Sequence, residues 1–273
     1  IDLSKSIALM ATHDGKLADY NIKTGGSSRI SRVAPQIAIP TAAGTGAEIG
    51  RACVMTLDTG RKCVAVNLNM VAKTVIADPE LTLSLPAQLT AATGIDALSH
   101  SVEAYLSPSV NPPADAIALD GFVRASQWIK KATQNGNDRE ARWHMMMASL
   151  QGGMVLQKGL GAAHAMATPL GENHHHHGTL IGILLPHAVA FNAPSVLNKI
   201  ENLQNAAGLK KPMSDWLQKL VQDINLPGRL SDLGETADKI PEIAKRAEED
   251  HLTLTNPRAI TAKDYETLLK KSL

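Results

Sequence analysis

The feature that most constrains the fold is a change of pattern near Pro86. From there to the C-terminus, apolar residues rich in Ala, Leu and Met recur with helical periodicity. Before it, residues typical of strands gather in four short stretches: 36–40, 51–57, 62–67 and 74–77. The first of these reads as a short buried strand. We therefore expect a small α/β part over residues 1–85, followed by an all-helical domain over residues 86–273.

Composition excludes several classes of protein. The 273 residues include 27 basic and 26 acidic ones, so the net charge of +1 gives no reason to expect nucleic acid or a membrane surface as a partner. No apolar run approaches the roughly 20 residues of a membrane span, and no signal peptide is evident. Cys53 and Cys63 flank an expected hairpin turn, and we expect both to be reduced thiols. These features predict a cytoplasmic protein.

The first candidate site lies in the stretch TAATGIDALSHSVEAYLS. Asp96 and His100 are four residues apart, so their side chains lie on one face of a helix and could share a divalent metal ion. The alternative is a hydrogen-bonded pair on the helix surface. The apolar residues around them predict a largely buried helix, where a carboxylate needs a cation or several donors. Burial therefore favours the metal site.

A second group of histidines lies in GAAHAMATPLGENHHHHGTLIGILLPH, residues 161–187. His164 falls in an apolar helical run and is either a metal ligand or a core histidine with a polar partner. His177 directly precedes an apolar helix, whose dipole favours the neutral imidazole that a metal requires. We expect His174, His175 and His176 in an exposed loop. One carboxylate and three imidazoles suit Fe²⁺ or Zn²⁺, and leave a position for a substrate oxygen.

The third candidate is PTAAGTGAE, residues 40–48, where an expected strand is followed by small and hydroxyl residues. Backbone amides and threonine hydroxyls of such a loop can approach a phosphate or ribose closely. A plain Gly/Thr turn would have the same sequence. Lys62, after the hairpin turn, is either a donor to a ribose hydroxyl or a solvated strand end.

Together these motifs resemble the iron-containing (group III) alcohol dehydrogenase family. PTAAGTGAE is similar to the family's nucleotide-contacting segment, VIADPELTLSLPAQLTAATGIDALSHSVEAYLSP to its signature helix, and HAMATPLG with HHGTLIGILLPHAVAFN to its second signature. The resemblance implies the remnant of a Rossmann-like α/β domain followed by an all-helical metal-binding domain, the dehydroquinate synthase-like architecture. The residues it assigns are the metal ligands Asp96, His100, His164 and His177 and the cofactor contacts Asp2, Lys5, Thr41, Thr45 and Lys62.

The resemblance also implies the activity. The enzyme would transfer hydride between a small alcohol, or the matching aldehyde or ketone, and NAD or NADP, with Fe²⁺ or Zn²⁺ bound. We further expect a homodimer. Two other functions remain open: a truncated, catalytically impaired metal-binding fragment, and a dehydroquinate synthase-like lyase. The lysine- and arginine-rich pocket of such lyases is not evident in this sequence.

Three departures from the family pattern stand out. The chain opens with IDLSKSIALM, inside a helical pattern and without the glycines of the family's GGGS-x-x-D-x-x-K element, so we expect an N-terminally truncated chain. Thr168 stands where many members have a histidine near the nicotinamide ring, so an acid–base role is not expected there. The loop from His164 to His177 is one residue shorter than usual, which makes His176 the alternative last ligand.

Overall fold

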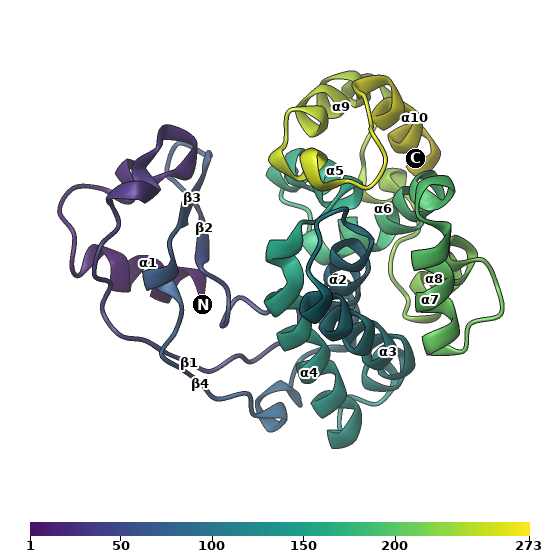
Figure 1. The fold of residues 1–273 in the computed structure, drawn as a ribbon, viewed down its shortest axis with the longest axis horizontal. Coiled ribbons are helices and arrows are strands. Elements are labelled where there is room, and N and C mark those ends of the chain that lie inside the picture. Colours follow the sequence, from purple (N-terminus) through teal and green to yellow (C-terminus); the bar gives the residue numbers. More distant parts are fainter. The chain divides into compact units, whose positions relative to one another are not determined.

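The computed structural model describes all 273 residues, which form two compact units. The first unit contains residues 1–41 and 46–78, and the second contains residues 42–45 and 79–273. Figure 1 shows strands only in the purple and blue part of the chain, and helices alone thereafter. The domain boundary expected at residue 85 stays a prediction.

The first unit combines one α-helix with two pairs of strands and several short 3₁₀ turns. The elements are α1 (Asp2–Met10), β1 (Ile37–Ala38), β2 (Ala52–Thr56), β3 (Lys62–Val66) and β4 (Thr74–Val75). Strands β1 and β4 are parallel, whereas β2 and β3 form an antiparallel hairpin. A small core lies beneath them, in which Leu9, Cys53, Ala65 and Met70 are almost completely buried.

The hairpin predicted between Cys53 and Cys63 is present, and Gly60 at its turn has a φ of 76°, which glycine adopts without strain. The register pairs Cys53 with Ala65, and Met55 with Cys63. The two cysteines are therefore not cross-strand partners. Both are free thiols, as expected.

The strand predicted at residues 36–40 is present as β1, but the prediction that it is buried is wrong for its isoleucines. Ile37 is 67% exposed and Ile39 is 47% exposed. The physical reason is that successive side chains of a strand point to opposite faces: Ala38 is 8% exposed, whereas Ile37 and Ile39 lie on the other face. Their composition resembled that of a core strand, but the packing that would bury them is not present.

The second unit is all-helical, as predicted. Its α-helices are α2 (Ala87–Leu106), α3 (Pro112–Gln134), α4 (Arg139–Val155), α5 (Ala162–Leu170), α6 (His177–Asn192), α7 (Leu197–Ala207), α8 (Met213–Asp223), α9 (Ile240–Glu248) and α10 (Ala262–Ser272). Side-chain caps fix several helix starts: Asn111 accepts from the Ala114 amide, and Asp138 accepts from the Ala141 amide. No helix combines the length and apolar character needed to cross a bilayer.

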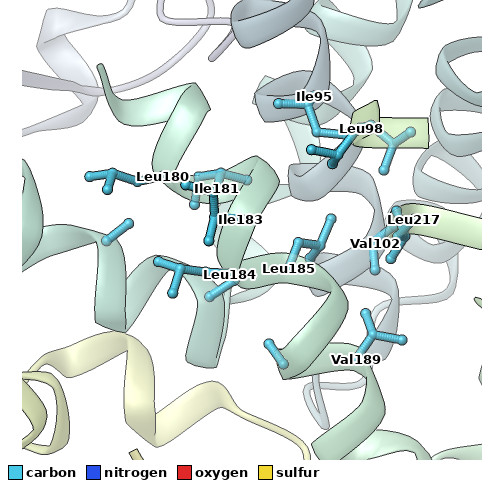
Figure 2. Close-up of a cluster of buried hydrophobic side chains, with 14 of the residues drawn as sticks. Ile95, Leu98, Val102, Leu180, Ile181, Ile183, Leu184, Leu185, Val189 and Leu217 are labelled. Carbon is cyan, nitrogen blue, oxygen red and sulfur yellow. The ribbon is translucent and has the colours of Figure 1, made fainter. Parts of the chain in front are cut away.

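Helix α2 lies at the centre of this unit and packs against α3, α4 and α6. Its apolar side chains, including Ile95 and Leu98, meet those of α6, including Leu180 and Ile181, in the core that Figure 2 shows. Helix α6 approaches α2 closely at Gly178, where a Cβ atom would lie 1.9 Å from the carbonyl oxygen of Ala92. This contact brings the first turn of α6 beside the middle of α2.

Candidate metal centre

Three side chains from three helices meet beside the centre of α2. Asp96 comes from α2, His164 from α5, and His177 is the first residue of α6; one ligand atom from each lies within 4.8 Å of the others. The Asp96 Oδ1 atom is 3.6 Å from His164 Nε2 and 3.5 Å from His177 Nε2. The structure thus brings together residues that are far apart in the sequence.

These residues fit a divalent cation. Asp96 Oδ1 and His164 Nε2 are both buried and have no hydrogen-bond partner. Leaving two such polar atoms unsatisfied in the interior is costly, and a cation between them would satisfy both. One carboxylate oxygen and two imidazole nitrogens form a donor set suited to Fe²⁺ or Zn²⁺.

His100 lies one helical turn after Asp96 and borders the cluster. Its Nε2 is 3.7 Å from Asp96 Oδ1, and its ring stacks on that of His164 with 4.8 Å between the centroids. It is not among the three residues whose ligand atoms lie within 4.8 Å of one another. Its assignment as a fourth ligand stays a prediction.

Glu103 was not predicted from the sequence, but it orients His164. Its Oε2 accepts a hydrogen bond of 2.5 Å from His164 Nδ1, and its Oε1 accepts one of 2.9 Å from the Ala163 amide. Because a carboxylate only accepts, the proton is on Nδ1, and Nε2 is left facing Asp96. The signal in the sequence was the spacing: Glu103 follows Asp96 by seven residues, two turns along the same helix face.

Burial and charge act against each other in this cluster. Burial lowers the pKa of His100 to about 4. Burial also acts to lower the pKa of His164, but the charges of Glu103 and Asp96 outweigh it and raise that pKa to about 9. Burial acts to raise the pKa of Asp96, yet the neighbouring histidines hold it well below its usual range. Without a metal, the cluster therefore pairs an ionised Asp96 with a protonated His164.

The four consecutive histidines take different positions. His174 has a left-handed backbone, with a φ of 64°, and is exposed. His175 Nε2 lies 2.7 Å from Glu235 Oε1, on a segment near the C-terminus. His176 is the exposed N-cap residue of α6. Only His177 of the run reaches the group around Asp96, although the choice between it and His176 as ligand stays a prediction.

Among the predicted cofactor contacts, Thr45 lies beside the candidate metal centre. Its hydroxyl donates a hydrogen bond of 2.9 Å to Asp96 Oδ2, the carboxylate oxygen that does not face the histidines. Thr168, where the resemblance led us to look for a histidine, donates from its hydroxyl to the carbonyl oxygen of His164 at 3.1 Å. Thr45 therefore has a clear partner in the site besides any cofactor.

The other predicted cofactor contacts belong to the first unit. Lys5 is completely buried, and its Nζ donates to the carbonyl oxygen of Ala47 at 2.7 Å and to that of Gly50. Asp2 Oδ2 accepts from the Val54 amide at 3.2 Å. Thr41 is exposed, and Lys62 lies half-buried on β3. All five cofactor assignments stay predictions.

Family models and known proteins match the chain throughout. The C-terminal model of the Fe-containing alcohol dehydrogenase family matches residues 90–273, and the iron-containing alcohol dehydrogenase model matches residues 1–79. A 4-hydroxybutyrate dehydrogenase of Cupriavidus necator is 42% identical over 290 residues, which cover 100% of this chain and 75% of that protein. A 1,3-propanediol dehydrogenase of Klebsiella pneumoniae is 34% identical, with 99% and 73% covered.

Solved structures share the fold. The crystal structure of a 1,3-propanediol oxidoreductase is similar with a TM-score of 0.92 and 32% identity, covering 100% of this chain and 74% of that one. A sulfoacetaldehyde reductase from Bifidobacterium kashiwanohense, in complex with NAD⁺, has a TM-score of 0.90 and 28% identity, with 99% and 73% covered. These similarities confirm the fold class expected from the sequence, an α/β part followed by an all-helical one.

Proposed function

The chain belongs to the iron-containing alcohol dehydrogenase family, a family of metal-dependent oxidoreductases that use a nicotinamide cofactor, and we propose that it reversibly oxidises the hydroxyl group of a small ω-hydroxy acid. The observation that carries the proposal is the group formed by Asp96, His164 and His177 inside a chain of this family. We assign these three residues as metal ligands, with His100 beside them as the fourth.

When bound, the divalent ion supplies Lewis acidity at the substrate oxygen, and the nicotinamide ring supplies the hydride acceptor. The residues of the chain provide position and charge. Glu103 holds the proton on His164 Nδ1 and keeps Nε2 directed at Asp96. The hydroxyl of Thr45 fixes the orientation of the Asp96 carboxylate. The aliphatic core behind α2 and α6 keeps both helices rigid.

The relatives support finer choices of substrate, metal and cofactor. The 42% identity to a 4-hydroxybutyrate dehydrogenase, against 34% to a 1,3-propanediol dehydrogenase, makes 4-hydroxybutyrate the first substrate to test. We propose Fe²⁺ rather than Zn²⁺ because the matching family models are those of iron-containing enzymes. We propose NAD rather than NADP because a similar structure is a complex with NAD⁺. The homodimer and the cytoplasmic location remain predictions from the sequence.

The test is NADH formation with 4-hydroxybutyrate, 1,3-propanediol and ethanol, on protein reconstituted with Fe²⁺ or Zn²⁺ and assayed for metal content. We expect turnover to require metal, and to be fastest with 4-hydroxybutyrate. The Asp96→Asn variant should lose metal and turnover together. Full turnover of this variant without metal would refute the assignment of the ligands, and metal-loaded wild type inactive on every alcohol would favour the metal-binding fragment instead.

A further inference from the structure

One buried carboxylate, that of Glu235, binds the loop that leads from α5 to α6 through hydrogen bonds. Glu235, which lies between the 3₁₀ turns at Leu230–Leu233 and Ala237–Lys239, is 6% exposed. Its Oε1 accepts one hydrogen bond of 2.7 Å from Asn173 Nδ2 and another of 2.7 Å from His175 Nε2. We call this pair of hydrogen bonds the loop clasp.

A second, weaker contact holds the same loop. Glu172 forms an ion pair of 2.7 Å with Arg246 on α9, but both side chains are about 40% exposed. Exposed ion pairs contribute little, whereas donors to a buried carboxylate are costly to remove. The other oxygen of Glu235, Oε2, is buried without a hydrogen-bond partner and lies 4.0 Å from Lys239 Nζ. The hydrogen bonds from Asn173 and His175 are therefore the main polar contacts that stabilise this buried carboxylate.

The loop clasp lies directly before a candidate metal ligand in the chain. His177 comes two residues after His175, and its side chain is 44% exposed, while that of Asp96 is 5% exposed. Packing around the imidazole therefore restricts His177 much less than it restricts the other members of the cluster. Four identical side chains in succession also offer several ways of supplying one imidazole to the metal. A contact that fixes the loop, in addition to the approach of α6 to α2 at Gly178, can select among them.

We propose that Glu235 is a positioning residue for the metal centre: by binding Asn173 and His175, it fixes the loop so that His177, and not a neighbouring histidine, is presented to Asp96. The inference rests on the proposed function, because it assumes that His177 binds the metal. His175 then serves as an anchor bound to Glu235 and not as a metal ligand. Ligands held in place before the metal arrives bind it more tightly, because less conformational freedom is lost on binding.

The experiment is a titration of the metal-free full chain with Co²⁺, monitored by its visible absorption, which reports the number and geometry of the ligands. The variants are Glu235→Ala and the double variant Asn173→Ala/His175→Ala, which opens the loop clasp from the loop side. We expect each to weaken Co²⁺ binding severalfold, because the loop that presents His177 is then no longer fixed before the metal binds. We also expect an altered absorption spectrum at saturation. Melting temperatures of the metal-free proteins are measured alongside.

His174→Asn is the matched control, because it removes an exposed imidazole from the same run while asparagine tolerates the left-handed backbone. It should bind Co²⁺ like the wild type. If Glu235→Ala does not fold, the double variant decides, since Asn173 is exposed and His175 is only half-buried. Wild-type affinity and spectrum in the clasp variants, a lowered melting temperature with an unchanged spectrum, or an equal loss in His174→Asn would each overturn the inference alone. Wild type that binds no Co²⁺ would overturn the proposed function as well.

Discussion

The Oε2 atom of Glu103 lies 2.5 Å from Nδ1 of His164, and this hydrogen bond decides which nitrogen of the imidazole faces Asp96. The carboxylate also raises the pKa of His164 against the effect of burial. Glu103 thus sets the tautomer of His164 and increases the basicity of its ring.

Replacing Glu103 with glutamine should weaken metal binding while the fold is retained. Glutamine has nearly the same shape, but it lacks the charge that makes Nε2 of His164 a strong donor to the metal. We expect a loss of affinity of about 10- to 100-fold, measured by competition with a chelator. Glu201→Gln, at an exposed position on α7, is the control. Unchanged affinity in Glu103→Gln would show that the hydrogen bond serves the fold only.

Metal affinity should rise with pH. The pKa of His164 is raised to about 9, so below that pH a metal must displace the proton from Nε2 of this ring, while Nδ1 keeps its proton for Glu103. Asp96 and His100 do not contribute to this pH dependence of metal affinity. The pKa of Asp96 is held well below its usual range, and that of His100 lies at about 4. Between pH 7 and 8.5 we expect affinity to increase about tenfold per pH unit, with about one proton released per metal.

Calorimetry in buffers of different ionisation enthalpy measures this proton release directly. The same pKa shift makes the stability of the metal-free protein depend on pH. A histidine whose folded-state pKa is raised contributes stability that is complete below its unfolded pKa of 6.5 and is lost as pH rises through about 9. The melting temperature of the metal-free protein should therefore fall over that window. A pH-independent affinity would contradict the protonated state of His164.

Local patterns in the sequence were sufficient for some features and not for others. The i,i+4 spacing of Asp96 and His100 and the apolar flanks of α2 predicted a buried polar helix face, and the helical periodicity after Pro86 predicted the all-helical unit. The sequence Asp58-Thr59-Gly60 between two strand-like stretches likewise predicted the hairpin turn. Each of these depends on neighbours within about one or two helical turns or within a hairpin.

The features that the sequence did not predict depend on distant partners. The exposure of Ile37 could not be predicted from the apolar composition of residues 36–40, because burial depends on the elements that pack against β1. The pairing of Glu235 with His175 joins residues 60 positions apart, and that of Asp96 with Thr45 joins residues 51 positions apart. Such contacts are set by helix packing, and no periodicity in the chain encodes them.

Thr45→Val should separate two roles of this threonine. Valine has nearly the same volume but cannot donate to Asp96 Oδ2, so the buried carboxylate loses a partner and metal affinity should fall severalfold. If Thr45 also contacts the nicotinamide cofactor, the Kd for NAD should rise in the same variant. Thr45→Ser, which keeps the hydroxyl, should restore both. Metal affinity and NAD binding that are both unchanged in Thr45→Val would exclude either role.

Gly178→Ala tests the close contact that carries His177 to α2. A methyl group at this position would lie 1.9 Å from the carbonyl oxygen of Ala92, which is backbone and has no rotamer to yield. Helix α6 would have to move away from α2, so we expect a loss of about 3 kcal/mol or more in the free energy of unfolding. Metal affinity should fall as well, because His177 precedes this glycine and moves with it. Urea unfolding and chelator competition measure the two effects.

Gly182→Ala, one turn further along α6, is the matched comparison. A Cβ atom there would meet Leu226 at 3.5 Å and Ile95 at 3.7 Å, which are ordinary contacts. Alanine is also favoured over glycine in a helix interior by up to about 1 kcal/mol, so this variant should be as stable as the wild type or more stable. Equal effects of the two substitutions would mean that backbone flexibility, and not the approach of α6 to Ala92, explains why glycine stands beside His177.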